Sequence, residues 1–151
     1  MEGIKRILVV SKWTKDCQTA VHYGVSLSQQ YGAELYVMHV IYDPFIFGGW
    51  NLPIPSLEKE YRIMMEEVKT ELDEVIQKEI QKGIKIRQIV KEGKPSEVVL
   101  NTVKEENIDL IIMLAHEEGR LEHFLFGHSN EEIIREMPCS ILLVKKEPEA
   151  C

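Results

Sequence analysis

The feature that most constrains the fold is a set of five short segments rich in isoleucine, valine and leucine. They are residues 5–10, 34–41, 84–90, 109–113 and 140–144. Each has the length of a β-strand, and the fourth is almost wholly apolar, which is typical of a strand covered on both faces. Stretches with helical spacing separate the segments, so strands and helices alternate. This order predicts an α/β fold with a five-stranded, parallel, doubly wound sheet and right-handed crossovers.

The longest predicted helix follows the second strand segment. Its apolar residues recur every three to five positions, and glutamate and lysine occupy the other face, as in an amphipathic helix. We expect Ser56 to cap this helix and Gly83 to end it. The residues expected to face the core are Leu57, Tyr61, Met64, Val68, Leu72, Val75 and Ile80. Shorter helices are expected after Pro95, which suits a first helical turn, and over residues 131–136.

Residues 42–55 interrupt the alternation and predict a long irregular loop. The stretch from Pro44 to Trp50 within it is rich in aromatic residues and glycine. Packed on the long helix, this stretch would be part of the core. Exposed, it would form a docking patch or a lid over the strand ends. The sequence leaves both alternatives open.

Length and charge bound the function. The chain of 151 residues predicts a single domain, 1–151. Its 18 basic and 25 acidic residues give a net charge of −7, without a block of consecutive lysines or arginines, so we expect no binding to nucleic acid or to an anionic membrane. The longest apolar run, Leu110 to Ala115, is far too short to span a bilayer. An odd number of cysteines, three, suits a reducing compartment, so a cytoplasmic protein is expected.

In doubly wound sheets, ligands bind at the carboxyl ends of the strands where the winding direction reverses. Applied to the predicted strands, this rule places a ligand rim at residues 11–13, 40–42 and 114–129.

The chain resembles the universal stress protein family over essentially its whole length. The residues that carry the resemblance are Lys5-Arg6-Ile7-Leu8-Val9-Val10, Ala33-Glu34-Leu35, His39-Val40, Gly93-Lys94-Pro95, Asp109-Leu110-Ile111-Ile112-Met113 and Pro138-Cys139-Ser140-Ile141-Leu142-Leu143-Val144. The resemblance implies strand order 3-2-1-4-5 and a homodimer formed through the last strand, residues Ile141, Leu142, Leu143 and Val144. It also implies a role in the stress response, with a protein partner that the sequence does not identify.

Many members of that family bind ATP through Gly-x-x-Gly, nine residues and then Gly-Ser or Gly-Thr, because small residues let backbone amides approach phosphates. In this sequence Leu114 and Glu117 replace the first two glycines, and His128 follows the retained Gly127. Lys12 replaces an aspartate at the end of the first strand. The candidate nucleotide- or ligand-binding residues are therefore Ser11, Lys12, Val40, Leu114, His116, Glu117, Gly127, His128 and Ser129.

These replacements favour a non-enzymatic stress-response regulatory or partner-binding protein with a degenerate ATP site and no expected cofactor. The alternative is a universal stress protein that binds ATP or AMP, with slow ATPase activity. A metal site built from His116, His123 and His128 is less favoured, since their spacings match no standard zinc pattern. Hydrolase chemistry by His128 and Ser129 lacks the usual nucleophile elbow.

Overall fold

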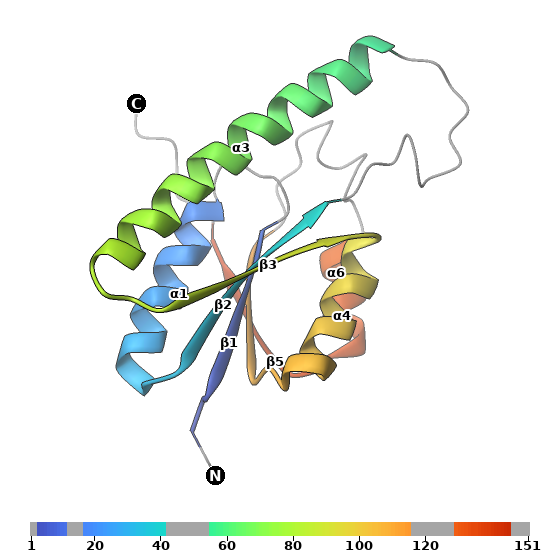
Figure 1. Cartoon of the computed structure of the whole chain (residues 1–151). Helices are drawn as coiled ribbons and strands as arrows, with labels where there is room; N and C mark the ends of the chain where they lie inside the picture. The colour runs from blue at the N-terminus through green and yellow to red at the C-terminus, as the bar shows by residue number, and fades with distance from the viewer. Residues whose placement is uncertain (1–2, 12–16, 42–54, 116–128, 146–151) are drawn as a thin grey trace.

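The apolar segments pair as parallel strands of one sheet. The computed structural model describes residues 3–11, 17–41, 55–115 and 129–145. The strand order is β3-β2-β1-β4-β5, which confirms the predicted doubly wound topology (Figure 1). The strands are β1 (Arg6–Ser11), β2 (Glu34–Ile41), β3 (Ile86–Glu92), β4 (Leu110–Leu114) and β5 (Ser140–Val144). β3 begins two residues later than predicted.

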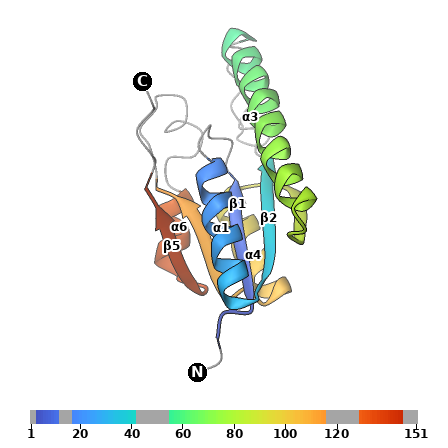
Figure 2. The same cartoon turned by 90° about the vertical axis from the view of Figure 1, so that its left-hand side faces the viewer.

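Helices of the described residues cover both faces of the sheet, as Figures 1 and 2 show. α1 (Cys17–Tyr31) and α3 (Pro55–Gln81) lie on one face, and α4 (Pro95–Glu106) and α6 (Ser129–Glu136) lie on the other. The first turns of α3 extend beyond the carboxyl ends of the strands (Figure 1). The prediction that Ser56 caps α3 was wrong, because the helix already begins at Pro55. Proline is well suited to a first helical position, where its fixed φ is helical and its missing N–H is not needed.

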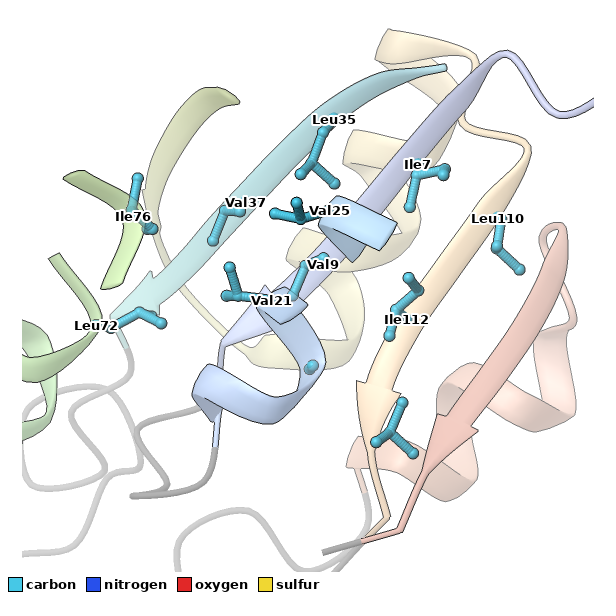
Figure 3. Close-up of a cluster of buried hydrophobic side chains, with 12 residues drawn as sticks. Ile7, Val9, Val21, Val25, Leu35, Val37, Leu72, Ile76, Leu110 and Ile112 are labelled. Atoms are coloured by element: carbon cyan, nitrogen blue, oxygen red, sulfur yellow. The ribbon is translucent and has the colours of Figure 1, made fainter. Parts of the chain in front are cut away.

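The core beneath α1 and α3 is built from every second residue of the strands. Ile7 and Val9 of β1 and Leu35 and Val37 of β2 point to this side (Figure 3). Among the α3 side chains that the structure describes, Leu72 and Ile76 are buried in this core, one helical turn apart. The side chains of Leu57, Tyr61, Met64 and Val68, also expected to face the core, lie outside that description. The expectation that Ile80 faces the core was wrong, since its side chain is 36% exposed.

The alternate strand residues form a second core beneath α4 and α6. Leu8, Tyr36 and Ile111 come from three adjacent strands, and Val99 and Ile133 come from the two helices. Cys139 packs against the margin of this core, and partial burial raises the pKa of its thiol to about 11. Because both faces of the central strands are covered, the strands read as continuous apolar runs in the sequence.

Candidate ligand site at the carboxyl edge of the sheet

The sheet brings three of the predicted site residues to its carboxyl edge. Ser11 ends β1, Val40 is the penultimate residue of β2 and Leu114 ends β4. β1 pairs with both β2 and β4, so Ser11 and Leu114 lie where the winding direction reverses. The backbone of Ser129 begins α6 on the same side of the molecule. The other five predicted residues, Lys12, His116, Glu117, Gly127 and His128, lie outside the described residues, as does the stretch from Pro44 to Trp50.

Ser11 places a polar group inside the fold at this edge. Its residue is only 1% exposed, and its Oγ makes no hydrogen bond to any described residue. Buried hydroxyls nearly always have a partner, because an unsatisfied one costs about 1–3 kcal/mol. Ser11 is therefore a polar position that a ligand or a water at the strand ends could satisfy.

Asn130 supplies a second polar group near the end of β4. Its Nδ2 donates a hydrogen bond of 3.1 Å to the carbonyl oxygen of Leu114, which ties α6 to that strand end. Its Oδ1 is buried and accepts no hydrogen bond within the described part of the chain. The sequence analysis missed Asn130, although an asparagine directly before the helix predicted over residues 131–136 and next to the rim was a usable signal.

Leu114 and Val40 contribute apolar side chains to the core. The half-buried side chain of Leu114 packs against the cluster under α1 and α3. Val40 is fully buried in the cluster under α4 and α6. The apolar side chain of Leu114 therefore occupies space at a position where the nucleotide-binding motif has glycine.

His39 is a titratable group at this edge that the sequence analysis did not select. It is 3% exposed, and it pairs in register with Ser11 of β1. Its Nε2 lies 3.8 Å from Oδ1 of Asp73 on α3. Burial lowers the pKa of His39, Asp73 raises it and Lys69 lowers it further. The strand alternation Leu35, Val37, His39 was the available signal, because it places the imidazole on the buried face.

A polar contact fixes the start of α6 against the start of α4. Ser96 Oγ donates a hydrogen bond of 2.5 Å to Oε2 of Glu132, and Lys94 Nζ lies 3.3 Å from the same oxygen. The hydrogen bond from Ser96 is the main cause that lowers the pKa of Glu132, and Lys94 acts in the same direction. This contact positions α6, the helix that follows the predicted ligand rim at residues 114–129.

The described residues can also be searched for a metal site and for a membrane-spanning helix. Among the described residues no group of three histidine, cysteine, aspartate or glutamate side chains is arranged to hold a metal ion. The three clustered histidines considered above, residues 116, 123 and 128, are outside those residues. No helix in the described ranges is long and apolar enough to cross a membrane.

Comparisons with known proteins agree with this fold. Residues 3–145 match the universal stress protein family. A universal stress protein of Methanocaldococcus jannaschii is 26% identical over 147 residues, which cover 94% of this chain and 82% of that protein. Among solved structures, UspA of Lactobacillus plantarum has a TM-score of 0.67 and 17% identity, with 95% of this chain and 99% of that one covered. An Arabidopsis thaliana family member with AMP bound has a TM-score of 0.58 and 14% identity, with 96% and 94% covered.

The two structures share the fold of this chain, and the match to the family spans nearly all of its length. The strand order β3-β2-β1-β4-β5 is the one expected from the resemblance. This chain belongs to the universal stress protein family.

Proposed function

We propose that this universal stress protein is a non-enzymatic regulatory protein of the stress response that binds a partner or a small ligand and has a degenerate ATP site. The observation that carries the proposal is Leu114. Its side chain packs into the core at the position of the first motif glycine, and its carbonyl oxygen already accepts a hydrogen bond from Asn130. A leucine side chain at this position does not suit a loop whose backbone amides approach a phosphate closely.

The charge of Glu117 supports the same conclusion. A carboxylate about 5 Å from one unit of phosphate charge, at an effective dielectric constant of about 20, costs roughly 3 kcal/mol. This repulsion corresponds to about two decades of affinity. Glu117 and Leu114 leave Gly127 as the one motif glycine in the sequence.

The proposal includes a cytoplasmic homodimer formed through β5. This strand pairs with β4 on one side and is at the end of the strand order. Leu143 is 45% exposed, and Ile141 and Leu142 are partly exposed. Short apolar edge strands are usually protected by pairing, so a second copy is the natural partner.

Binding of an adenine nucleotide in a changed pose is the second candidate. The buried polar atoms of Ser11 and Asn130 at the carboxyl edge favour it, because a nucleoside carries hydroxyl and amine groups that could satisfy them. The Arabidopsis family member is recorded with AMP bound. AMP also carries less negative charge toward Glu117 than ATP does.

The experiment that separates the two candidates starts with freshly purified protein. It is denatured, released small molecules are identified by mass spectrometry, and ATP and AMP are then titrated calorimetrically with magnesium. We expect no released nucleotide and no ATP binding at low micromolar concentration. Stoichiometric ATP would overturn the proposal, and binding of AMP alone would favour the second candidate.

The double variant Leu114→Gly/Glu117→Gly tests the physical cause. If these two side chains block the phosphates, the variant gains ATP affinity by about two decades or more. The single variant Leu114→Gly is the matched comparison, since it restores one glycine and keeps the charge of Glu117. A double variant with no gain would show that the motif replacements are not the cause of weak binding.

A further inference from the structure

A cavity lies at the opposite end of the sheet from the candidate ligand site. It has a volume of about 870 Å³ and lies where α1 and α3 end and β2 and β3 begin. Ligand pockets usually measure about 300–1,000 Å³, so the size fits a small molecule. Tyr36 is the last β2 residue in the lining, five positions before the end of β2 at Ile41, so at about 3.3 Å per residue the groove lies about 17 Å from the carboxyl edge.

The groove has an apolar lining between two helix ends. Leu35 and Ile86, which pair in register, lie at the starts of β2 and β3, and Ile80 and Ile84 come from the end of α3 and the following turn. Gly32 and Gly83 line the groove with φ of +64° and +94°, and a Cβ built on either glycine would meet nothing within 4 Å. Space is therefore open above both turns.

Backbone hydrogen bonds satisfy some of the carbonyl groups at the two helix ends beside the groove. The amide of Ala33 donates to the carbonyl oxygen of Ser28 at 2.9 Å, and the amide of Gly83 donates to that of Ile80 at 3.0 Å. These bonds satisfy carbonyls that would otherwise carry the negative end of each helix dipole. Glu34, the acidic residue in the lining, is also engaged: it lies 3.4 Å from Nε of Arg6 and accepts a hydrogen bond of 2.9 Å from the hydroxyl of Tyr36.

Positive charge is concentrated beside these isoleucines. Residues 78–87 hold four basic residues and one acidic residue, a formal charge of +3 in a chain whose net charge is −7. They are Lys78, Lys82, Lys85 and Arg87, with Glu79. Lys85 lines the groove, is exposed and forms no ion pair with a described side chain. Arg87 also lines it, but its guanidinium lies over the ring of Tyr36 at 5.7 Å and its Nη1 lies 3.9 Å from Oε2 of Glu106, so Lys85 is the basic group on which the site depends.

We propose that this groove binds a small amphipathic anion. The apolar body of the ligand lies against Ile80, Ile84 and Ile86, and its acidic group is next to Lys85. Burial of the isoleucine surface supplies the affinity, and the lysine selects negatively charged compounds over neutral ones of the same shape. The proposal concerns a site separate from the carboxyl edge and does not depend on the function proposed above.

The test uses the full chain and a fluorescent probe with the required chemistry, 1-anilinonaphthalene-8-sulfonate. We expect saturable binding with one site per chain, displacement by dodecanoate and weaker binding of the neutral analogue N-phenyl-1-naphthylamine. Lys85→Glu should weaken binding of the sulfonate about five- to tenfold, because it replaces an attraction between two exposed charges by a repulsion. Binding of the neutral analogue should not change in this variant.

Two further variants keep the proposal falsifiable. Lys59→Glu makes the same change in net charge on an exposed residue 21 positions before Ile80 on α3, about 30 Å away, and should leave the affinity unchanged. Gln29→Trp fills the groove from its exposed rim and should weaken both probes. Equal losses in Lys59→Glu and Lys85→Glu, no effect of Gln29→Trp, or no saturable binding to the wild type would each overturn the proposal.

Both a free small molecule and a membrane lipid can supply an apolar body with an acidic group. Sedimentation of the protein with phosphatidylglycerol vesicles distinguishes these two kinds of ligand. Sedimentation that Lys85→Glu abolishes would assign the groove to a lipid headgroup, and its absence together with probe binding would assign it to a free ligand.

Discussion

Asp73 Oδ1 lies 3.8 Å from Nε2 of the buried imidazole of His39, which links α3 to the carboxyl end of β2. Burial nevertheless outweighs the attraction and lowers the pKa of His39 below its ordinary value of 6.5. The unfolded chain therefore binds a proton at this residue more readily than the folded chain does. The contribution of His39 to stability is complete above about pH 6.5 and is lost as the pH falls from there toward the lower, folded-state pKa.

Acidification below pH 6.5 should lower the free energy of unfolding less in His39→Gln than in the wild type. Asp73→Asn should show a larger loss than the wild type, because Asp73 raises the pKa of His39 and its removal lowers that pKa further. Urea unfolding followed by circular dichroism at pH 7.5 and 5.5 measures both differences. The same pH dependence in all three proteins would contradict the assignment to His39.

Gly24 allows α1 to lie close to the sheet. A Cβ at this position would be 2.6 Å from Cγ2 of Val9 and 3.0 Å from Cδ1 of Leu35, both buried. Gly24→Ala should therefore destabilise the protein by about 1–3 kcal/mol through overpacking, although alanine favours helices. Thermal unfolding checks this value.

Gly3→Ala is the control for Gly24→Ala, because its Cβ would meet nothing within 4 Å and its stability should be unchanged. The double variant Gly24→Ala/Val9→Ala should lose less stability than the sum of the two single variants, because removing the valine methyl groups makes room for the new methyl group. If the stability losses of the two single variants simply add in the double variant, the close approach of α1 to β1 does not limit packing at Gly24.

Asp109 holds the start of β1 against β4. Its Oδ2 accepts hydrogen bonds of 2.9 Å from the backbone amides of both Lys5 and Arg6. Asp109→Ala removes both acceptors and should lower the free energy of unfolding by about 1–2 kcal/mol, with Asp109→Asn losing less since it keeps a side-chain carbonyl. Urea denaturation of the three proteins provides the measurement, and an alanine variant as stable as the wild type would argue against this role.

Ser96 and Glu132 should be energetically coupled. A double-mutant cycle with Ser96→Ala and Glu132→Ala should give a coupling energy of about 1 kcal/mol at pH 7. The hydrogen bond lowers the pKa of Glu132 below 4.5, so the coupling should be complete above pH 4.5 and decrease as the pH falls through the folded-state pKa. The exposed pair Lys91 and Glu105, at 2.8 Å, is the comparison and should show weaker coupling.

The two edge strands provide a matched test of the proposed dimer. Leu143 on β5 and Val90 on β3 are 45% and 57% exposed. Leu143→Glu should convert a dimer into a monomer, because it places charge in the proposed interface, while Val90→Glu should leave the dimer intact. Light scattering coupled to size-exclusion chromatography measures the mass. A monomeric wild type at high concentration would contradict the proposed dimer.

The positions of three candidate site residues were predictable because strand ends are predictable. Ser11, Val40 and Leu114 were selected as residues at the ends of apolar runs, and the parallel sheet brings those ends to one edge. His39 and Asn130 were missed for a different reason. Their importance depends on burial and on contacts with residues distant in sequence, Asp73 and Leu114, which hydrophobic periodicity does not report.

The sequence by itself determined the type and order of the elements that the structure describes, since strand and helix periods are local properties of the apolar pattern. The resemblance to a family added the strand order. Tertiary structure decided which residues of a helix face are buried: Ile76 enters the core, whereas Ile80, in the last turn of α3, lines the groove beside the starts of β2 and β3. It also decided that the pKa of His39 is lowered, which favours the neutral imidazole, and that the side chain of Leu114 packs against the core. Burial and pKa depend on neighbours that only the folded chain brings together.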